Sequence, residues 1–571
     1  MPGFYITNCT PVLPENMPGT DCIREQMQVD EFFVCRNTRR QFLNDKLFYQ
    51  NEKYAVILEG VLLNKGELME TYAADSYEKL VEALIEKDPQ GFCKEFRGMF
   101  SGAVYHKASK EWMVFSDQVG NRLVLYYVKD GKVIIGSQMN YIVDTMKANA
   151  LERRGDVNGS KQFLLYGSFM DNSTWLADVK RVLPCDAVKI SAEGAASYTY
   201  HVFPETYREL SDADAIRKLD ETFCQAVKRA LDKNKEYGYT GVIDISGGAD
   251  SRMVAYTAKR LGCENVVMAH YSQSGTYEMK VALEVAADLE MECYLNPLDD
   301  AGFLTDPEKI ISMNSGAADY SGITGGERVL RTLSSRNPGI ELTGILGTIR
   351  DGIGVGDCEM AVQKPSLAFR KFLCTPEIKE ADCQVNILDR YKTNHVFWHY
   401  TRAMLGGLST AFTRQNYVEP YTPFGDVDFL DTFLTIHPKQ LVKNQLQLRW
   451  MVEKYPKAAA IRHSVTALPL SWELKPWFPV VEELCSIYYR GMGKITGFCK
   501  IYMNPFLKWD REKPWLRQWT DSYFREGLEQ VRQSGLVEEE LLERANWLYH
   551  VTPQQKYAAI TAVTCWKKFL I

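Results

Sequence analysis

The segment that most constrains this chain is a short glycine turn between a strand and a helix. An apolar run over 241–245 leads into Ser246-Gly247-Gly248-Ala249-Asp250-Ser251-Arg252, and a helical pattern follows over 250–261. The two glycines let the backbone turn tightly and bring its N–H groups to one point, where the start of a helix adds positive charge. The segment therefore predicts a binding site for pyrophosphate or for the triphosphate of a nucleotide.

Asp250 lies beside this predicted phosphate site, where two negative charges would repel each other. We therefore expect Mg²⁺ between them, with Asp250 as its ligand. The turn is not a Walker loop, because no Gly-Lys-Ser or Gly-Lys-Thr follows it, and the GxGxxG pattern of dinucleotide sites is absent. The alternative is a plain strand–turn–helix in which small residues serve packing.

Apolar periodicity divides the chain into three regions. Before residue 200 it predicts mostly strands, at 54–58, 99–105, 112–115, 123–127 and 133–135, with one helix at 76–86. A helix at 211–233 then precedes alternating strands and helices, namely 241–245, 250–261, 265–271, 277–289, 293–295 and 340–342. This alternation predicts βαβ units and a parallel sheet. From about Phe397 the chain is helix-rich, and no linker separates the regions, so we expect a packed interface with a boundary near 201–211.

Composition and charge exclude several classes of protein. Apolar residues make up 46% and charged residues 25%, as in ordinary globular proteins. The net charge of −6 gives no general attraction to nucleic acid or to an anionic membrane. No apolar stretch approaches the ~18 residues of a membrane helix, and no signal peptide is visible. The 14 cysteines include no CxxC pair, so a zinc site is not expected. We expect a cytoplasmic protein without nucleic-acid or membrane partners.

The glycine turn and several other segments resemble the asparagine synthetase family of pyrophosphatase-loop ATP enzymes. The resembling segments lie at 60–64, 96–105, 116–127, 165–167, 182–184, 417–426, 515–519 and 566–570. The resemblance implies an α/β protein with two domains. Residues 1–205 would form an N-terminal αββα sandwich similar to a glutaminase, and residues 206–571 a doubly wound parallel-sheet ATP-pyrophosphatase domain with a helical C-terminal extension.

The same resemblance implies ATP and Mg²⁺ as cofactors, with Asp250 as the metal ligand. The residues it assigns to cofactor binding are Ile245, Ser246, Gly247, Gly248, Asp250, Ser251, Arg252, Thr343 and Gly344.

The N-terminal region departs from the family at the positions that hydrolyse glutamine. A glutaminase of this family attacks with a cysteine that follows the removed initiator methionine, but here Pro2 follows Met1. Glu59 stands where an asparagine is expected before Gly60, and its carboxylate would repel an oxyanion. We therefore predict that residues 1–205 form an inactive glutaminase-like domain. The alternative is that processing makes Cys9 the terminal residue.

The second phosphate-side motif also departs from the family. Thr343 and Gly344 match it, but Thr348 stands where a metal-binding acid is expected. Asp351, three residues further on, is a candidate substitute.

The catalytic lysine of the family has no direct counterpart. Counting from Glu419 places it near 462–464, which contain no lysine. A similar motif with wider spacing makes Lys494 the candidate for neutralising charge as pyrophosphate leaves, and Lys475 is a second candidate. The resemblance gives Glu419 a catalytic role, either orienting an amine or accepting its proton. A purely structural role for Glu419, as the partner of an arginine or of a helix, is the alternative.

Loss of glutamine hydrolysis with retention of the ATP loop resembles β-lactam synthetases and lasso-peptide cyclases. The implied reaction adenylates a carboxylate, releasing pyrophosphate, and an amine then displaces AMP to form an amide. The substrate would be a small molecule or a peptide, and carboxylate and amine can belong to one molecule. An ammonia-dependent asparagine synthetase and a catalytically inactive nucleotide-binding relative are the alternatives. The oligomeric state is left open, with a homodimer as one option.

Overall fold

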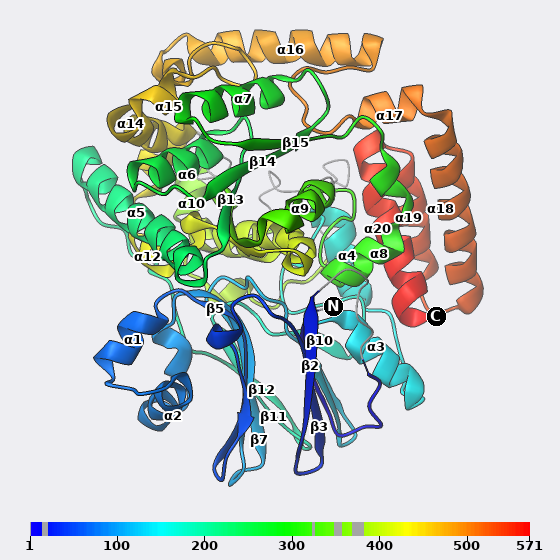
Figure 1. The fold of residues 1–571 in the computed structure, drawn as a ribbon. Helices are drawn as coiled ribbons and strands as arrows, with labels where there is room; N and C mark the ends of the chain where they lie inside the picture. The colour runs from blue at the N-terminus through cyan, green and yellow to red at the C-terminus, as the bar shows by residue number, and fades with distance from the viewer. Residues whose placement is uncertain (1, 14–20, 323–325, 348–356, 368–381) are drawn as a thin grey trace.

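The computed structural model describes residues 2–13, 21–322, 326–347, 357–367 and 382–571. Two antiparallel six-stranded sheets come first, a parallel five-stranded sheet follows, and helices complete the chain (Figure 1). The predicted mixed α/β class, the parallel sheet and the helix-rich C-terminal region are confirmed.

The two antiparallel sheets form a sandwich. In order, the first contains β10 (Val179–Arg181), β8 (Leu125–Lys129), β9 (Lys132–Gly136), β1 (Gly3–Thr7), β3 (Phe32–Arg39) and β2 (Cys22–Val29). The second contains β12 (Gly194–Thr199), β11 (Asp186–Ser191), β7 (Glu111–Ser116), β6 (Gly98–His106), β5 (Tyr54–Leu62) and β4 (Leu47–Gln50).

Helices cover both outer faces of this sandwich, which gives the predicted αββα layers (Figure 1). Side chains alternate along β1, so Phe4 and Ile6 pack between the sheets and Tyr5 packs outward. The outer face of the second sheet is covered by α1 (Lys65–Thr71) and α2 (Tyr77–Lys87), and that of the first by α3 (Met139–Ala148) and α4 (Val157–Tyr166).

The parallel sheet has the order β15 (Cys293–Pro297), β14 (Val266–Ser272), β13 (Thr240–Asp244), β16 (Pro338–Leu342), β17 (Glu419–Tyr421). All four neighbouring pairs are parallel. The strand order reverses at β13, so the connections after β13 and β16 leave the sheet in opposite directions. In open α/β sheets, ligands bind at this point, beyond the carboxyl ends of the strands.

Helices enclose the parallel sheet and extend beyond it. Those before residue 400 are α5 (Asp212–Tyr237), α6 (Ala249–Arg260), α7 (Tyr277–Leu289), α8 (Pro307–Asn314), α9 (Glu327–Leu333), α10 (Cys358–Ala361) and α11 (Asn394–Trp398). Those after it are α12 (Val427–Phe433), α13 (Pro438–Leu441), α14 (Gln445–Lys454), α15 (Pro456–Ala460), α16 (Phe478–Thr496), α17 (Phe506–Glu512), α18 (Pro514–Ser534), α19 (Glu539–Tyr549) and α20 (Pro553–Leu570). None of the helices within the described ranges is long and apolar enough to cross a lipid bilayer.

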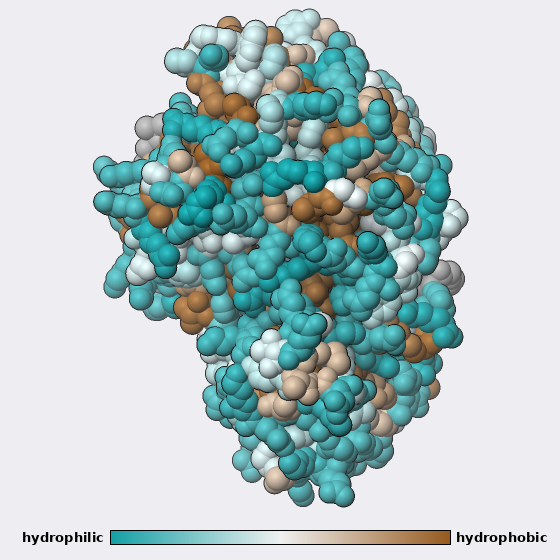
Figure 2. All heavy atoms as spheres, turned by 60° about the vertical axis from the view of Figure 1, so that its left-hand side comes forward, coloured by the Kyte–Doolittle hydropathy of each residue, from teal (hydrophilic) through white to brown (hydrophobic). Residues whose placement is uncertain are grey.

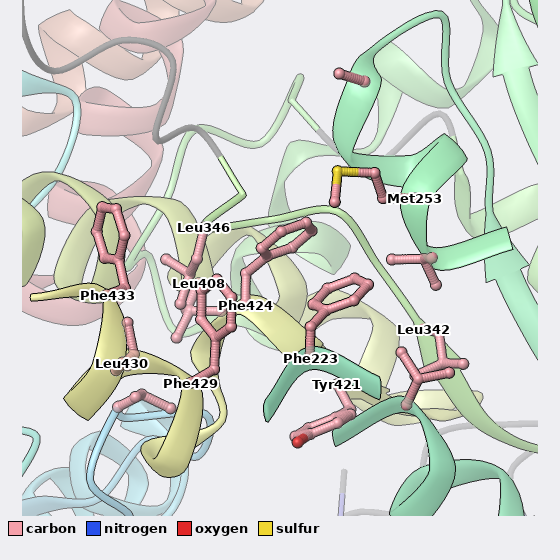
Figure 3. Packing of buried hydrophobic residues seen from close by; sticks show 14 of the residues in the cluster. Phe223, Met253, Leu342, Leu346, Leu408, Tyr421, Phe424, Phe429, Leu430 and Phe433 are labelled. Atoms are coloured by element: carbon pink, nitrogen blue, oxygen red, sulfur yellow. The ribbon is translucent and has the colours of Figure 1, made fainter. Parts of the chain in front are cut away.

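One apolar core supports the carboxyl end of the parallel sheet. Phe223 of α5, Met253 of α6 and Leu342 of β16 converge there with Phe424 and Phe429 (Figure 3). Because this core reaches the first turns of α6, it fixes the glycine turn that precedes that helix.

The sandwich packs directly against the rest of the chain, as the absence of a linker predicts. Arg97 pairs with Asp428 at 2.9 Å, and Arg122 donates to Glu419. The predicted boundary at 205/206 falls between β12 and α5, where Ser211 caps the helix by accepting from the backbone N–H of Asp214.

Candidate functional site

The glycine turn is held from within by its two serines. The backbone N–H of Ser246 donates to the Ser251 hydroxyl at 3.0 Å, and that of Gly248 donates to the Ser246 hydroxyl at 3.2 Å. Ile245, 1% exposed, anchors the turn in the core below. The turn is thus preorganised at the reversal point of the sheet, and the serine hydroxyls brace it.

Gly247 is the point where other elements come closest to the turn. Its N–H donates to the carboxylate of Glu278, in the first turn of α7. A Cβ at this position would lie 2.7 Å from Glu278 Oε2 and 2.9 Å from Ser464 Cβ, so only glycine fits without displacing a neighbour. The turn therefore binds a negatively charged group through a backbone N–H, which is the chemistry that a phosphate requires.

The connection after β16 packs against this turn. A Cβ at Gly344 would lie 2.9 Å from the backbone N of Ser251 and 3.1 Å from Asp250 Cβ. The backbone N–H of Thr343 donates to Tyr421 O of β17 at 2.9 Å, which fixes its position. The structure thus brings Thr343 and Gly344 beside Ser246–Ser251, whereas Thr348 and Asp351 lie outside the described residues.

Asp250 is half-buried between this connection and α14. Gln447 donates to its carboxylate. Across the described ranges, no group of three or more His, Cys, Asp or Glu side chains could hold a metal ion. At the position of Asp250, Mg²⁺ would therefore need phosphate oxygens and water to complete its coordination.

Arg252 is fully buried and binds backbone carbonyls. Its guanidinium donates to Gly247 O at 2.8 Å, to Arg462 O at 2.7 Å and to Ile461 O at 3.2 Å. Burial lowers the pKa of Arg252 to about 10. The hydrogen bonds of Arg252 therefore connect the turn to residues 461–462, and each of them goes to a backbone carbonyl and not to an anion.

The hydrogen bond from Arg252 to Arg462 O places residues 462–464 against the turn. Counting from Glu419 puts the family's lysine near these same residues. Ser464 faces Gly247 directly, as the close approach of its Cβ shows. The guanidinium of Arg462, in the same stretch, donates to Glu284 at 2.9 Å. The side chain at the expected lysine position is thus an uncharged hydroxyl.

Lys494 and Lys475 both lie on the surface. Lys494 is in the last turn of α16, and among the described residues neither lysine side chain makes a hydrogen bond or an ion pair. The segment after α16 does reach the sheet, because Gln273 after β14 donates to Cys499 O at 3.0 Å. Lys494 is therefore near the segment that covers the carboxyl end of β14, with its side chain exposed.

Glu419 lies at the interface between the sandwich and the parallel sheet. It pairs with Ile340 in the middle of β16, while Tyr421 occupies the carboxyl end of β17. It is 2% exposed and accepts from Arg122. Burial alone would raise the pKa of Glu419, but Arg122, Lys46 and Arg39 outweigh it and lower the pKa. In the structure, Glu419 is therefore the buried ion-pair partner of Arg122, which corresponds to the structural role.

Pro2 and Glu59, the two residues at which the sequence departs from the glutaminase pattern, lie near one end of β1. Gly3 pairs with Asn37, so Pro2 lies beside Thr38, whose hydroxyl donates to Glu59 at 2.7 Å. Cys9 follows the opposite end of β1, beyond Thr7. A processed chain that began at Cys9 would therefore place its thiol far from Glu59.

Glu278 and Gln447 complete the site and were not predicted. An acidic residue in a first helical turn is commonplace, because it favours the helix dipole, so Glu278 carries no distinctive signal. Gln447 is nearly two hundred residues from Asp250 in the sequence and only the fold brings them together.

Residues 43–201 match the family model of a glutamine amidotransferase domain. The matched range begins before β4 and ends just after β12, so it contains the whole second sheet of the sandwich. The protein is therefore a mixed α/β chain in which a region similar to a glutamine amidotransferase domain precedes a parallel sheet and a helical C-terminal region.

Two solved structures show weaker likenesses. The allosteric regulatory enzyme of purine biosynthesis is 9% identical, with 52% of this chain and 74% of that chain covered and a TM-score of 0.24. Glutamine phosphoribosylpyrophosphate amidotransferase from B. subtilis is 10% identical, with 51% and 84% covered and a TM-score of 0.22. Both scores lie well below 0.5, so no shared fold of the whole chain follows. Comparison with curated proteins gives no match.

Proposed function

We propose that this chain is an ATP-dependent, amide-forming synthetase of the asparagine synthetase type with an inactive glutaminase-like domain. The observation that carries the proposal is the Ser246–Ser251 turn at the sheet's reversal point, with Gly344 packed against it. The amidotransferase match over residues 43–201 supports amide chemistry in general.

In this proposal the turn and the start of α6 bind the β- and γ-phosphates of ATP. Asp250 would hold Mg²⁺ together with phosphate oxygens, and the metal would supply charge neutralisation as pyrophosphate leaves. The substrate carboxylate attacks the α-phosphorus, and an amine then displaces AMP. Because Pro2 offers no thiol, the amine comes from a second substrate or from the same molecule.

Phosphate binding would require Glu278 to leave Gly247. One N–H cannot serve two anions at the same time, and the two would repel each other. The carboxylate of Glu278 would therefore compete with ATP for this N–H.

A second candidate is a nucleotide-binding relative without turnover. Ser464 favours it, because a hydroxyl occupies the position where charge neutralisation is expected. Lys494 is the candidate replacement for the lysine. If it acts, Lys494→Met should slow turnover by on the order of 10², and unchanged turnover would transfer the assignment to Lys475.

Two measurements test the proposal. Calorimetry with a non-hydrolysable ATP analogue and Mg²⁺ should show binding that Gly247→Val abolishes. Gly302→Val is the matched control, since a Cβ at Gly302 would meet nothing within 4 Å. Asp250→Asn should weaken binding only when Mg²⁺ is present. Loss of binding in the control as well would contradict the assignment of the site to Gly247, and no binding by the unmodified protein would contradict both candidates.

Product analysis then separates the two candidates. With a panel of carboxylates and amines, including amino acids and peptides, the synthetase should release AMP and pyrophosphate in equal amounts. ADP as the main product would contradict adenylation, whereas nucleotide binding without turnover on any substrate would favour the inactive relative. Glutamate release from glutamine would overturn the inactive assignment of the N-terminal domain.

A further inference from the structure

The outer face of α16 is apolar and exposed. Val480, Leu484, Ile487, Tyr488 and Ile495 have exposed fractions of 64%, 62%, 57%, 60% and 69%. Of the 19 residues of the helix, only Phe478 and Gly493 are buried. In Figure 1 the helix runs along the upper edge of the molecule. Figure 2 shows a mostly hydrophilic surface with apolar patches in its upper half. Contiguous exposed apolar surface of this kind marks an interaction site.

The spacing of this face is that of a two-helix seam. Residues 480, 484, 487 and 491 recur at intervals of four, three and four, the pattern by which helices pack side chains into each other's gaps. The fourth position is Gly491, where a Cβ would meet nothing within 4 Å. The seam is therefore open and would admit a large side chain from a second helix.

The exposed apolar face as a whole, which adds Tyr488 and Ile495 to these four positions, is also symmetric along the helix. Val480 and Ile495, Leu484 and Gly491, and Ile487 and Tyr488 are equidistant from the midpoint between residues 487 and 488. A second copy of α16, running antiparallel, would place each residue opposite its counterpart. Leu484 of each copy would then fill the space over Gly491 of the other.

The charges beside the seam fit the same arrangement. Glu483 and Arg490 flank it on one side, both exposed, and contact each other within one helix at 3.4 Å. In an antiparallel pair, Glu483 of one copy would lie near Arg490 of the other. In a parallel pair the two copies of this flank would lie on opposite sides of the seam, so Glu483 of one copy could not reach Arg490 of the other.

We propose that α16 is the contact surface of a homodimer, in which two copies of the helix pack antiparallel about a two-fold axis near Ile487 and Tyr488. Such an interface uses the same patch on both subunits and closes on itself. The inference rests on α16 alone and holds whether or not the chain is a synthetase.

Mass measurement by light scattering over a dilution series tests the dimer. The unmodified protein should show twice the chain mass of 65.3 kDa at high concentration. Leu484→Glu should raise the dimer dissociation constant by roughly tenfold or more, because it places a charge in the seam. Leu536→Glu, at a residue 40% exposed outside α16, is the matched control and should leave the dimer intact. A single-chain mass at all concentrations would overturn the proposal, as would a dimer that tolerates Leu484→Glu.

Charge exchange tests the antiparallel register. Glu483→Arg and Arg490→Glu should each weaken the dimer, and the double variant should restore it, because the pairs re-form with reversed sign. Failure of the double variant to restore the dimer would overturn the register.

Cross-linking gives an independent readout. Tyr488→Cys lies near the proposed axis and should form an intermolecular disulfide under oxidation, beyond any given by the native cysteines. Val480→Cys lies far from the axis and should not. The opposite result would overturn the two-fold position.

Discussion

At the scale of single residues, the contact between Glu278 and Gly247 provides a direct test of the proposed phosphate site. The carboxylate already occupies the N–H that a phosphate would use. Hydrogen bonds to charged groups contribute about 1.5–3 kcal/mol, so removing this competitor has a measurable effect.

Glu278→Gln should therefore tighten binding of the ATP analogue by roughly tenfold, because an uncharged amide competes less well for the N–H. Calorimetry measures the affinity. Glu290→Gln, at the other end of α7, serves as the control and should change nothing. Weaker binding in Glu278→Gln would show that the carboxylate helps to hold the nucleotide or its metal.

Glu419 offers a second prediction at this scale. Glu419→Ala leaves Arg122 buried without its partner, which should lower the free energy of unfolding by about 3–5 kcal/mol. The double variant Glu419→Leu with Arg122→Met removes both charges and should cost less. Urea unfolding measures both. Because the pKa of Glu419 is lowered in the folded protein, its contribution should be present above pH 4.5 and be lost as the pH falls further. Equal losses in the single and double variants would contradict the pairing.

At the scale of elements, the sequence predicts well those helices and strands that carry their own signals. The predicted helix 277–289 is observed as α7 with the same bounds, and its cap Thr276 accepts from the backbone N–H of Met279. By contrast, the sequence does not predict β17, because a strand of three residues is too short to show periodicity. Its proline also argues against a strand, since proline is found in sheets mainly in edge strands, and β17 is an edge strand. The helices α3 and α4 were also missed.

The same distinction applies to the candidate site. The turn could be predicted because its residues are consecutive and strand, glycines and helix follow one another. Glu278 and Gln447 reach it from α7 and α14, so only tertiary structure reveals them, whereas the spacing from Glu419 already points to 462–464.

Thr276→Ala tests the link between the α7 cap and the site. Loss of the cap should lower the free energy of unfolding by about 1 kcal/mol, and it should also change nucleotide affinity, because Glu278 is in the first turn of the same helix. Ser76→Ala removes the equivalent cap of α2, far from the site. It should give a similar loss of stability with unchanged affinity. The same affinity in both variants would contradict the coupling.

At the scale of the whole molecule, buried histidines should make the protein sensitive to mild acid. Burial lowers the pKa of His201 to about 4, that of His395 to about 3 and that of His399 to about 4. The unfolded chain binds these protons with a pKa near 6.5, so stability should be full above that pH and decline as the pH falls toward 4.

Thermal unfolding over this pH range measures the decline. His395→Phe should reduce its slope, since one proton fewer is taken up on unfolding. A melting temperature that stays constant below pH 6.5 would contradict the role of the buried histidines.

The sandwich and the C-terminal helices share one core. Trp175 packs edge-on against Trp566 of α20 at 6.1 Å between ring centres, and Phe163 of α4 belongs to the same cluster. Deleting residues 1–205 would therefore remove Trp175 and expose Trp566, and it would leave Glu419 buried without the countercharge of Arg122. The sandwich thus stabilises the rest of the chain, whatever chemistry it performs.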